Sequence, residues 1–412
     1  MRQRCHVARA RSELVVVVSA AATFGALMAS YSAFKPVRDT LVLDGDPDRI
    51  PWLFTATFVA LLVLSPIWGA LVKRGPRHVV PISFHVFAVC AFGFAFANHA
   101  GWAPVVVGRV FYVWASVFNL FVVSVFWSLL SDLLGANTAK RLYGPIAAGG
   151  TIGTVVGPVL TKALVAHVGD AGILAMSGLL LEVAVVGVAL LRRSALAVSS
   201  EGEGDPPVEG GAFDGLIEVV KSPYLRSIVA YVLCTSFAAT FIYLAQSHIV
   251  HDLLKDRAAR TDYFATVDIY VSIATLVVQL LLAGPLISWV GPGVVLCVLP
   301  LVQVAGLIGL VTMPSLALLM VVLVVGKTAT HGLTRPSREL LFTVISREDK
   351  YRAKNAIDTV GYRLGDFSGA WLGEGLAAAA SGALVGGVAV LGVAWIALAT
   401  LLGRGFRRKL AP

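Results

Sequence analysis

Charged residues are scarce in this chain, at 14% of its 412 residues, whereas hydrophobic residues make up 57%. So low a charged fraction excludes an ordinary soluble domain, in which about a quarter of the residues are charged. Uncharged stretches long enough to cross the roughly 30 Å hydrocarbon core of a bilayer as helices recur along the whole sequence. The sequence therefore predicts an all-α protein of the membrane.

Cysteines are also few, and the four are scattered between the basic N-terminus and three apolar stretches, at Cys5, Cys90, Cys234 and Cys297. Their spacing fits neither a disulfide framework nor a zinc site. The chain also lacks an Asp-rich metal motif, a nucleophile elbow and a soluble nucleotide-binding motif. We therefore expect no enzyme activity, no catalytic residue, no bound metal and no cofactor. A sensor that transports nothing is an alternative that these absences leave open.

The length rule for transmembrane helices predicts about twelve spans. They are 14–43, 52–72, 79–97, 104–134, 144–166, 171–191, 224–248, 263–288, 293–311, 315–345, 356–380 and 383–403.

The first of these stretches follows a basic N-terminus, so a secretory signal peptide is one alternative reading. Its apolar region is long for a signal, and the internal repeat described next needs it as a first helix. Most of the 33 Lys and Arg residues cluster in segments that share one side if the N-terminus is inside: 2–11, 73–77, 140–141, 192–226, 347–354 and 404–409. By the positive-inside rule, both termini face the cytoplasm of a plasma (inner) membrane.

A polar segment rich in Gly, Pro and Glu divides the chain at 194–222 and is typical of a linker. The two parts on either side resemble each other. Gly69 corresponds to Gly284 and Lys140 to Lys354, and the sequence separation within the two pairs is almost the same. We predict a six-helix bundle over 1–193, a cytoplasmic linker over 194–222 and a second bundle over 223–412. Two such repeats are typical of a transporter with its site at their interface.

Two motifs resemble the major facilitator superfamily. The segment "GALVKRGPR" is similar to the superfamily's loop motif after the second helix, with Lys73 and Pro76 where that motif has Asp and Gly. "GGTIGTVVGP" resembles the antiporter motif of its fifth helix, where glycines permit close helix packing and proline bends the span. The resemblance implies the major facilitator fold, with gating or motif residues at Gly69, Arg74, Arg77, Gly153, Gly157 and Pro158.

A narrower resemblance is to the bacterial and plastid nucleotide translocases, the ATP:ADP antiporters. "YSAFKPVRDTLVLDG" is similar to the pattern of their first helix, and "FWSLLSDLLGANTAKRLYG" at 126–144 to that of their fourth. The acidic residue that this family tends to carry early in the fourth helix is missing here. The resemblance implies that Lys35, Arg38 and Asp39 belong to a substrate site.

Basic residues also form stripes on two predicted helices. On the tenth span, Lys327, His331, Arg335 and Arg338 lie within roughly an 80° arc of an α-helix. At about 100° per residue, Lys35, Arg38 and Asp39 fall on one side of a helix, with Pro36 placed to kink it. In the facilitator fold, the first, fourth, seventh and tenth helices line the cavity. The remaining substrate-binding candidates on the last three of these helices are Arg109, Asn119, Tyr231, Lys327, His331, Arg335 and Arg338. Arg and Lys in a poorly screened cavity suit a phosphate or several carboxylates.

Each candidate has a structural alternative. Lys35 and Arg38 are also read as anchors that extend to the membrane surface, and Arg109 and Arg338 as gate residues. His331 has an ordinary hydrogen-bonded role as its alternative. Three acidic residues, Asp268, Asp358 and Asp366, are candidates for coupling or charge balance, or else simply neutralise nearby cations.

The sequence thus predicts a secondary transporter of a small anionic, phosphorylated substrate, with nucleotide exchange as the leading hypothesis. A proton-coupled exporter of drugs or metabolites is the alternative, and the basic stripes argue against it. A membrane-embedded enzyme acting on lipid phosphate ranks below both. We expect a monomer in the lipid bilayer that binds no nucleic acid, because the net charge of +9 is spread over many short loops.

Overall fold

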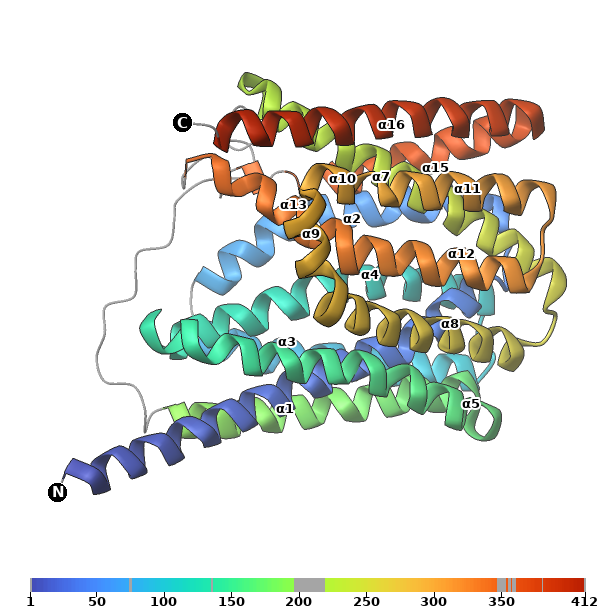
Figure 1. Ribbon diagram of the computed structural model, residues 1–412. Coiled ribbons are helices and arrows are strands. Elements are labelled where there is room, and N and C mark those ends of the chain that lie inside the picture. The colour runs from blue at the N-terminus through green and yellow to red at the C-terminus, as the bar shows by residue number, and fades with distance from the viewer. Residues whose placement is uncertain are drawn as a thin grey trace. The chain divides into compact units, whose positions relative to one another are not determined.

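The computed structural model describes residues 2–73, 76–134, 136–195, 219–346, 353–354, 357, 361–379 and 381–410. Every regular element within these ranges is helical (Figure 1). The elements before the predicted linker are α1 (Arg2–Val42), the short 3-10 helix η1 (Pro47–Arg49), α2 (Ile50–Lys73), α3 (Pro76–His99), α4 (Pro104–Leu133) and α5 (Ala136–Ala195).

More short elements follow the linker than precede it. They are α7 (Pro223–Leu253), α8 (Arg257–Val277), the π-helical η2 (Val278–Ala283), α9 (Gly284–Val290), α10 (Pro292–Leu296), α11 (Val298–Thr312), α12 (Leu316–Thr328), the π-helical η3 (Ala329–Thr334), α13 (Arg335–Leu341), the 3-10 helix η4 (Phe342–Val344), α15 (Tyr362–Ala379) and α16 (Ser381–Leu410). The predicted linker at 194–222 lies mostly outside the described residues.

Ten helical stretches in the described part of the chain are long and apolar enough to cross a membrane. One of them, Leu142–Ser194, contains two predicted spans, because Gly169 breaks α5 with a φ of 64° and a ψ of −177°. A positive φ of this kind favours glycine, which has no Cβ to clash with the backbone. The predicted span 356–380 is not among the ten, and α15 covers the part of it from Tyr362 to Ala379. The prediction of an all-α membrane fold is confirmed.

The first helix does not end before its charged residues. α1 runs without interruption through Pro36 to Val42, so Lys35, Arg38 and Asp39 lie inside the helix. The prediction that the first span continues past Phe34 is confirmed. A proline in a helix interior loses one backbone hydrogen bond, and a membrane helix tolerates this where neighbouring groups compensate.

The chain forms two compact units. One contains residues 1–45, 59–206 and 255–269, and the other contains residues 46–58, 207–254 and 270–412. Each unit is therefore built mainly from one predicted repeat but includes a short segment of the other.

In the first unit, α1 and α5 pack closely along most of their lengths (Figure 1). The packing depends on glycines of α5, because a methyl group at Gly153 would overlap the carbonyl oxygen of Gly25. A methyl group at Gly157 would lie 2.5 Å from the carbonyl oxygen of Ala29, and Pro158 follows within the same helix. Small residues at such interfaces bring helix backbones together, which is how membrane helices gain packing energy.

Each unit has its own core. Phe34, Phe111 and Phe118 are completely buried in the first unit and pack against Trp114. In the second unit, Tyr231 and Trp395 pack together at a ring distance of 5.8 Å. Both cores hold the helices that carry the predicted site residues.

Candidate functional site

Three charged residues in the last part of α1, Lys35, Arg38 and Asp39, are paired inside the first unit. The Lys35 ammonium donates a hydrogen bond to Asp268 of α8 at 2.7 Å, and the exposed fractions of the two side chains are 24% and 10%. Arg38 donates from both Nε, at 2.9 Å, and Nη2, at 2.6 Å, to one oxygen of Asp39. The Arg38 guanidinium also lies over the ring of Tyr112 on α4, 5.1 Å from its centroid. These side chains therefore contact protein groups within the first unit.

The pairing of Lys35 joins residues that lie 233 positions apart in the sequence. Asp268 was a candidate for charge balance, and its contact with a candidate binding residue is consistent with that role. Asp39 is the counter-ion of Arg38, and Asp268 is the counter-ion of Lys35.

The first half of α8 is attached to α1 by further polar contacts that the sequence analysis missed. Arg257 forms a two-bond ion pair with Asp44, which is at the end of the first span. Arg260 donates to the carbonyl oxygen of Leu43 at 3.2 Å. The Thr261 hydroxyl lies 2.8 Å from both the Thr40 hydroxyl and a carboxylate oxygen of Asp170.

A neighbouring contact connects α8 to α5. Lys162 donates to both oxygens of Asp262 and to the Thr266 hydroxyl, each at 2.8 Å. The dense alternation of charges in "KDRAARTD" at 255–262, just before the predicted eighth span, was the available signal for these contacts. They hold this part of α8 in the first unit.

The tenth span changes helical type at its basic residues. Residues 329–334 form the π-helical η3, whose wider turn alters the positions of the residues that follow relative to an ideal α-helix. His331 and Arg335 are exposed, Lys327 is half-buried and Arg338 is buried. The four residues were predicted to share one narrow face, and the structure divides them between an exposed and a buried side.

The eighth span has a π-helical segment in the same unit, and the two segments contact each other. Gln279 in η2 donates from Nε2 to the carbonyl oxygen of His331 in η3 at 3.1 Å. A methyl group at Gly332 would lie 2.8 Å from a methyl group of Val278. π-Helical turns in membrane and soluble helices are frequent at functional sites.

Arg338 and Arg335 differ sharply in their surroundings. Arg338 donates from Nη1 to the Tyr362 hydroxyl at 2.8 Å and lies over the ring of Tyr362. Arg335 is exposed, and its side chain makes no hydrogen bond or ion pair with any residue that the structure describes. Of the two, Arg335 is the one able to offer its guanidinium fork to a ligand.

The remaining described candidates lie on α4, α7 and α15. The side chains of Arg109 and Asn119, on α4, are half-buried. Tyr231 is fully buried, and its hydroxyl donates to the carbonyl oxygen of Leu296 at 2.8 Å. Asp366 accepts a hydrogen bond from Ser236 at 2.5 Å and lies 3.5 Å from Arg363. This ion pair matches the alternative in which the acid neutralises a neighbouring cation.

The aromatic pair of the fourth helix belongs to the core of the first unit. Phe126 stacks on Phe24 at 4.7 Å, and Trp127 packs edge-on against Phe24 and Tyr143. The resemblance to the translocases placed this pair in the fourth helix, and the structure shows it packing α4 against α1 and α5.

Several predicted residues fall outside the described part of the chain. Arg74 and Asp358 lie there, as do the side chains of Arg77, Lys140 and Arg141 and the surroundings of Gly69. Among the described residues, no group of three or more His, Cys, Asp or Glu side chains is placed to hold a metal ion.

Solved structures of transporters share the architecture. A bacterial homolog of the human lysosomal transporter Spinster matches with 16% identity and a TM-score of 0.57, covering 97% of this chain and 98% of that one. The nucleoside transporter NupG matches with 12% identity and a TM-score of 0.63, covering 97% and 99%. A bacterial homologue of the iron transporter ferroportin matches with 14% identity and a TM-score of 0.61, covering 98% and 99%. At these identities, the likeness shows the fold alone.

No curated protein matches the sequence. The family model described as "Major Facilitator Superfamily" matches residues 14–338, which is most of the chain. Together with the helical membrane fold, this match points to a transporter rather than an enzyme. The chain belongs to the Major Facilitator Superfamily and is a multi-pass membrane transporter.

Proposed function

We propose that this transporter carries a small anionic, phosphorylated substrate by alternating access, and that its exchange reaction is of the ATP:ADP antiport type. The observation that carries the proposal is Arg335, an exposed guanidinium in a membrane-crossing stretch with no partner among the described residues. A charge at membrane depth is costly unless it faces water or a ligand, so such residues mark substrate pathways. The planar fork of Arg matches phosphate oxygens better than the single charge of Lys does.

The paired cations of α1 support the same proposal. In the arrangement seen here, carboxylates balance Lys35 and Arg38, so the carrier needs no bound anion to compensate these two charges. A phosphate group that approached them would compete with Asp268 and Asp39 for the same hydrogen-bond donors. A bound phosphate that displaced these carboxylates would bind more tightly to the carrier conformation in which the ion pairs are broken. Alternating access requires such a difference in substrate affinity between two conformations.

Ligand-induced stabilisation tests the substrate class. Purified transporter is heated with ATP, ADP, phosphate, uncharged adenosine or a cationic drug, and its unfolding temperature is measured. A ligand that binds only the folded protein at 100 times its Kd stabilises it by about 2.7 kcal/mol. We expect ATP, ADP or phosphate to raise the unfolding temperature while adenosine does not. Stabilisation by the cationic drug together with none by the three anions would reject an anionic substrate.

The Lys35–Asp268 pair gives a prediction of its own. Replacing Asp268 by Asn leaves the Lys35 charge without a partner in a largely buried position, and we expect a loss of roughly 1–3 kcal/mol of stability. Lys35→Gln combined with Asp268→Asn should lose less than the sum of the two single changes. Thermal unfolding of all four proteins measures the coupling, and strictly additive losses would show that the contact has no energetic role.

A second candidate, proton-coupled export, is favoured by the same buried acid. If Asp268 exchanged its Lys35 contact for a proton, a pH gradient would drive transport. Uptake that depends on a pH gradient, and that internal nucleotide does not stimulate, would support this alternative and reject antiport.

Orientation follows from the positive-inside rule and is tested separately. Single cysteines at Ser200 in the linker and at Pro412 are introduced into a variant without the native cysteines. We expect both to resist impermeant thiol reagents in intact cells and to react after permeabilisation, because both segments are proposed to be cytoplasmic. Labelling from outside would reverse the assigned topology.

A further inference from the structure

A cavity in the second unit lies apart from all of the residues considered above. Its volume is about 320 Å³, within the range of about 300–1,000 Å³ that is usual for small-molecule pockets. It is bounded by the start of α2 with η1 and by parts of α7, α11, α15 and α16. None of the predicted substrate-binding residues lines it.

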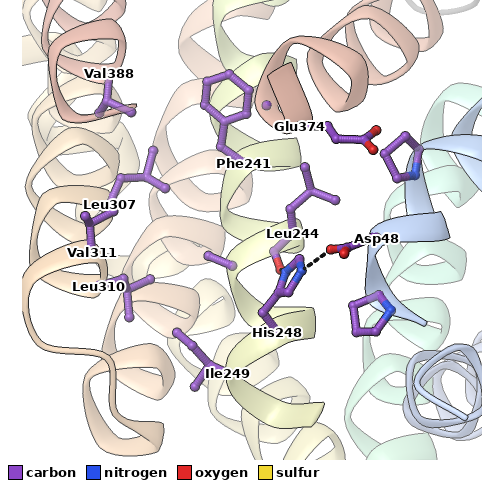
Figure 2. Close-up of a pocket in the computed structure, with 14 residues that line it drawn as sticks. Asp48, Phe241, Leu244, His248, Ile249, Leu307, Leu310, Val311, Glu374 and Val388 are labelled. Carbon is purple, nitrogen blue, oxygen red and sulfur yellow. Dashed lines mark hydrogen bonds and ion pairs between the residues drawn. The ribbon is translucent and has the colours of Figure 1, made fainter. Parts of the chain in front are cut away.

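The lining is divided by chemistry. Leu307 and Val311 on α11 and Val388 on α16 form an apolar side, whereas Glu374 on α15 and Asp48 in η1 lie on the opposite side (Figure 2). Phe241 and Leu244 of α7 complete the apolar surface. A molecule that filled the cavity would have an apolar body and one polar end.

Two of the three titratable side chains in the lining are occupied with each other. His248 Nε2 lies 2.9 Å from Asp48 Oδ1, and His248 Nδ1 lies 2.9 Å from the carbonyl oxygen of Leu244 (Figure 2). Both ring nitrogens therefore face oxygen acceptors, an arrangement that suits the doubly protonated imidazolium. The Asp48–His248 pair is then electrically neutral.

Glu374 is the third titratable group, and its charge is not compensated within the described residues. Its Oε2 atom is buried and has no hydrogen-bond partner there. A buried carboxylate oxygen without a partner is energetically costly, so the site is complete only with a cation or donor beside it. One surplus negative charge next to an apolar space matches a ligand with one positive charge and an apolar tail.

We propose that this cavity binds a lipophilic ammonium ion, with its cationic nitrogen at Glu374 and its hydrocarbon chain between α7, α11 and α16. The apolar lining disfavours a hydrated metal ion, which would need several oxygen ligands. The same chemistry occurs in a free long-chain amine and in the headgroup amine of phosphatidylethanolamine. The site is separate from the proposed anion site, so it does not depend on the proposed function.

Saturable binding of radiolabelled dodecylamine to the purified full-length protein tests the proposal, with dodecanol as an uncharged probe of equal chain length. We expect the protein to bind dodecylammonium about tenfold or more tightly than dodecanol, because only the amine forms a charge-assisted contact. Glu374→Gln preserves the shape of the side chain and should remove this preference. Glu182→Gln, at a half-buried glutamate of α5 that pairs with His85 outside the cavity, should retain it.

Competition in nanodiscs shows whether the site takes a lipid headgroup amine or a free amine. Dodecylammonium binding that falls when phosphatidylethanolamine replaces part of the phosphatidylcholine assigns the site to the lipid headgroup, and unchanged binding assigns it to free amines. Equal affinity of the unaltered protein and Glu374→Gln for dodecylammonium would overturn the proposal. So would the absence of saturable binding, or equal affinity for amine and alcohol.

Discussion

Replacing Arg335 by Gln is expected to lower the apparent affinity for the phosphorylated substrate by roughly ten- to a hundredfold. The reason is that a hydrogen bond to a charged group contributes about 1.5–3 kcal/mol, and Arg335 has no partner among the described residues that would take its place. Stability should change little, because no side-chain hydrogen bond or ion pair among the described residues is lost. Substrate-dependent stabilisation and uptake, measured over a range of concentrations, give the affinity.

Two companion variants define what Arg335 contributes. Arg335→Lys retains the charge without the fork and should recover only part of the affinity, since a phosphate is then bound through a single ammonium. Arg407→Gln removes an exposed arginine near the end of α16 and should leave affinity unchanged. If Arg335→Gln reduced the amount of folded protein but left the affinity of the remainder intact, Arg335 would be a structural residue.

Adding one methyl group at Gly153 is expected to disrupt the first unit. The Cβ of alanine would overlap the carbonyl oxygen of Gly25 and lie 2.9 Å from the backbone nitrogen of Ala29, so α1 and α5 must move apart. Backbone atoms cannot move aside as a flexible side chain does, and overpacking of this kind costs about 1–3 kcal/mol or more. Gly153→Ala should therefore lower the unfolding temperature by several degrees and reduce the yield of monodisperse protein.

The same helix supplies a matched control. At Gly144, an added Cβ meets no atom within 4 Å. Gly144→Ala should be neutral or slightly stabilising, because alanine is a better helix former than glycine. Equal behaviour of the two variants would show that the glycines of α5 do not set the distance between α1 and α5.

The sequence was sufficient to predict features that depend on local composition. Long apolar stretches identified the helices, and the continuation of α1 through Pro36 followed from the apolar run after Asp39. The glycines of "GGTIGTVVGP" indicated close packing correctly, because a residue without a side chain lets two helix backbones approach each other closely.

Features that depend on distant contacts were not predictable in the same way. Nothing near Lys35 in the sequence indicates that its counter-ion is Asp268, and the placement of residues 255–269 in the first unit depends on several such pairs. The π-helical segment η3 was also missed, because an α-helical period of 3.6 was assumed across Lys327 to Arg338. That assumption placed Arg338 beside Arg335, whereas the structure buries Arg338 against Tyr362.

Nucleotide counter-exchange in proteoliposomes tests the proposed transport reaction most directly. Labelled ATP is added outside vesicles that contain the purified protein and either ADP or no nucleotide inside. Antiport predicts that internal ADP accelerates uptake several-fold, that internal adenosine does not, and that Arg335→Gln needs a much higher ATP concentration for the same rate. Uptake of ATP, ADP and phosphate no faster than in protein-free vesicles, with or without internal nucleotide, would contradict the proposal of a phosphorylated-anion exchanger.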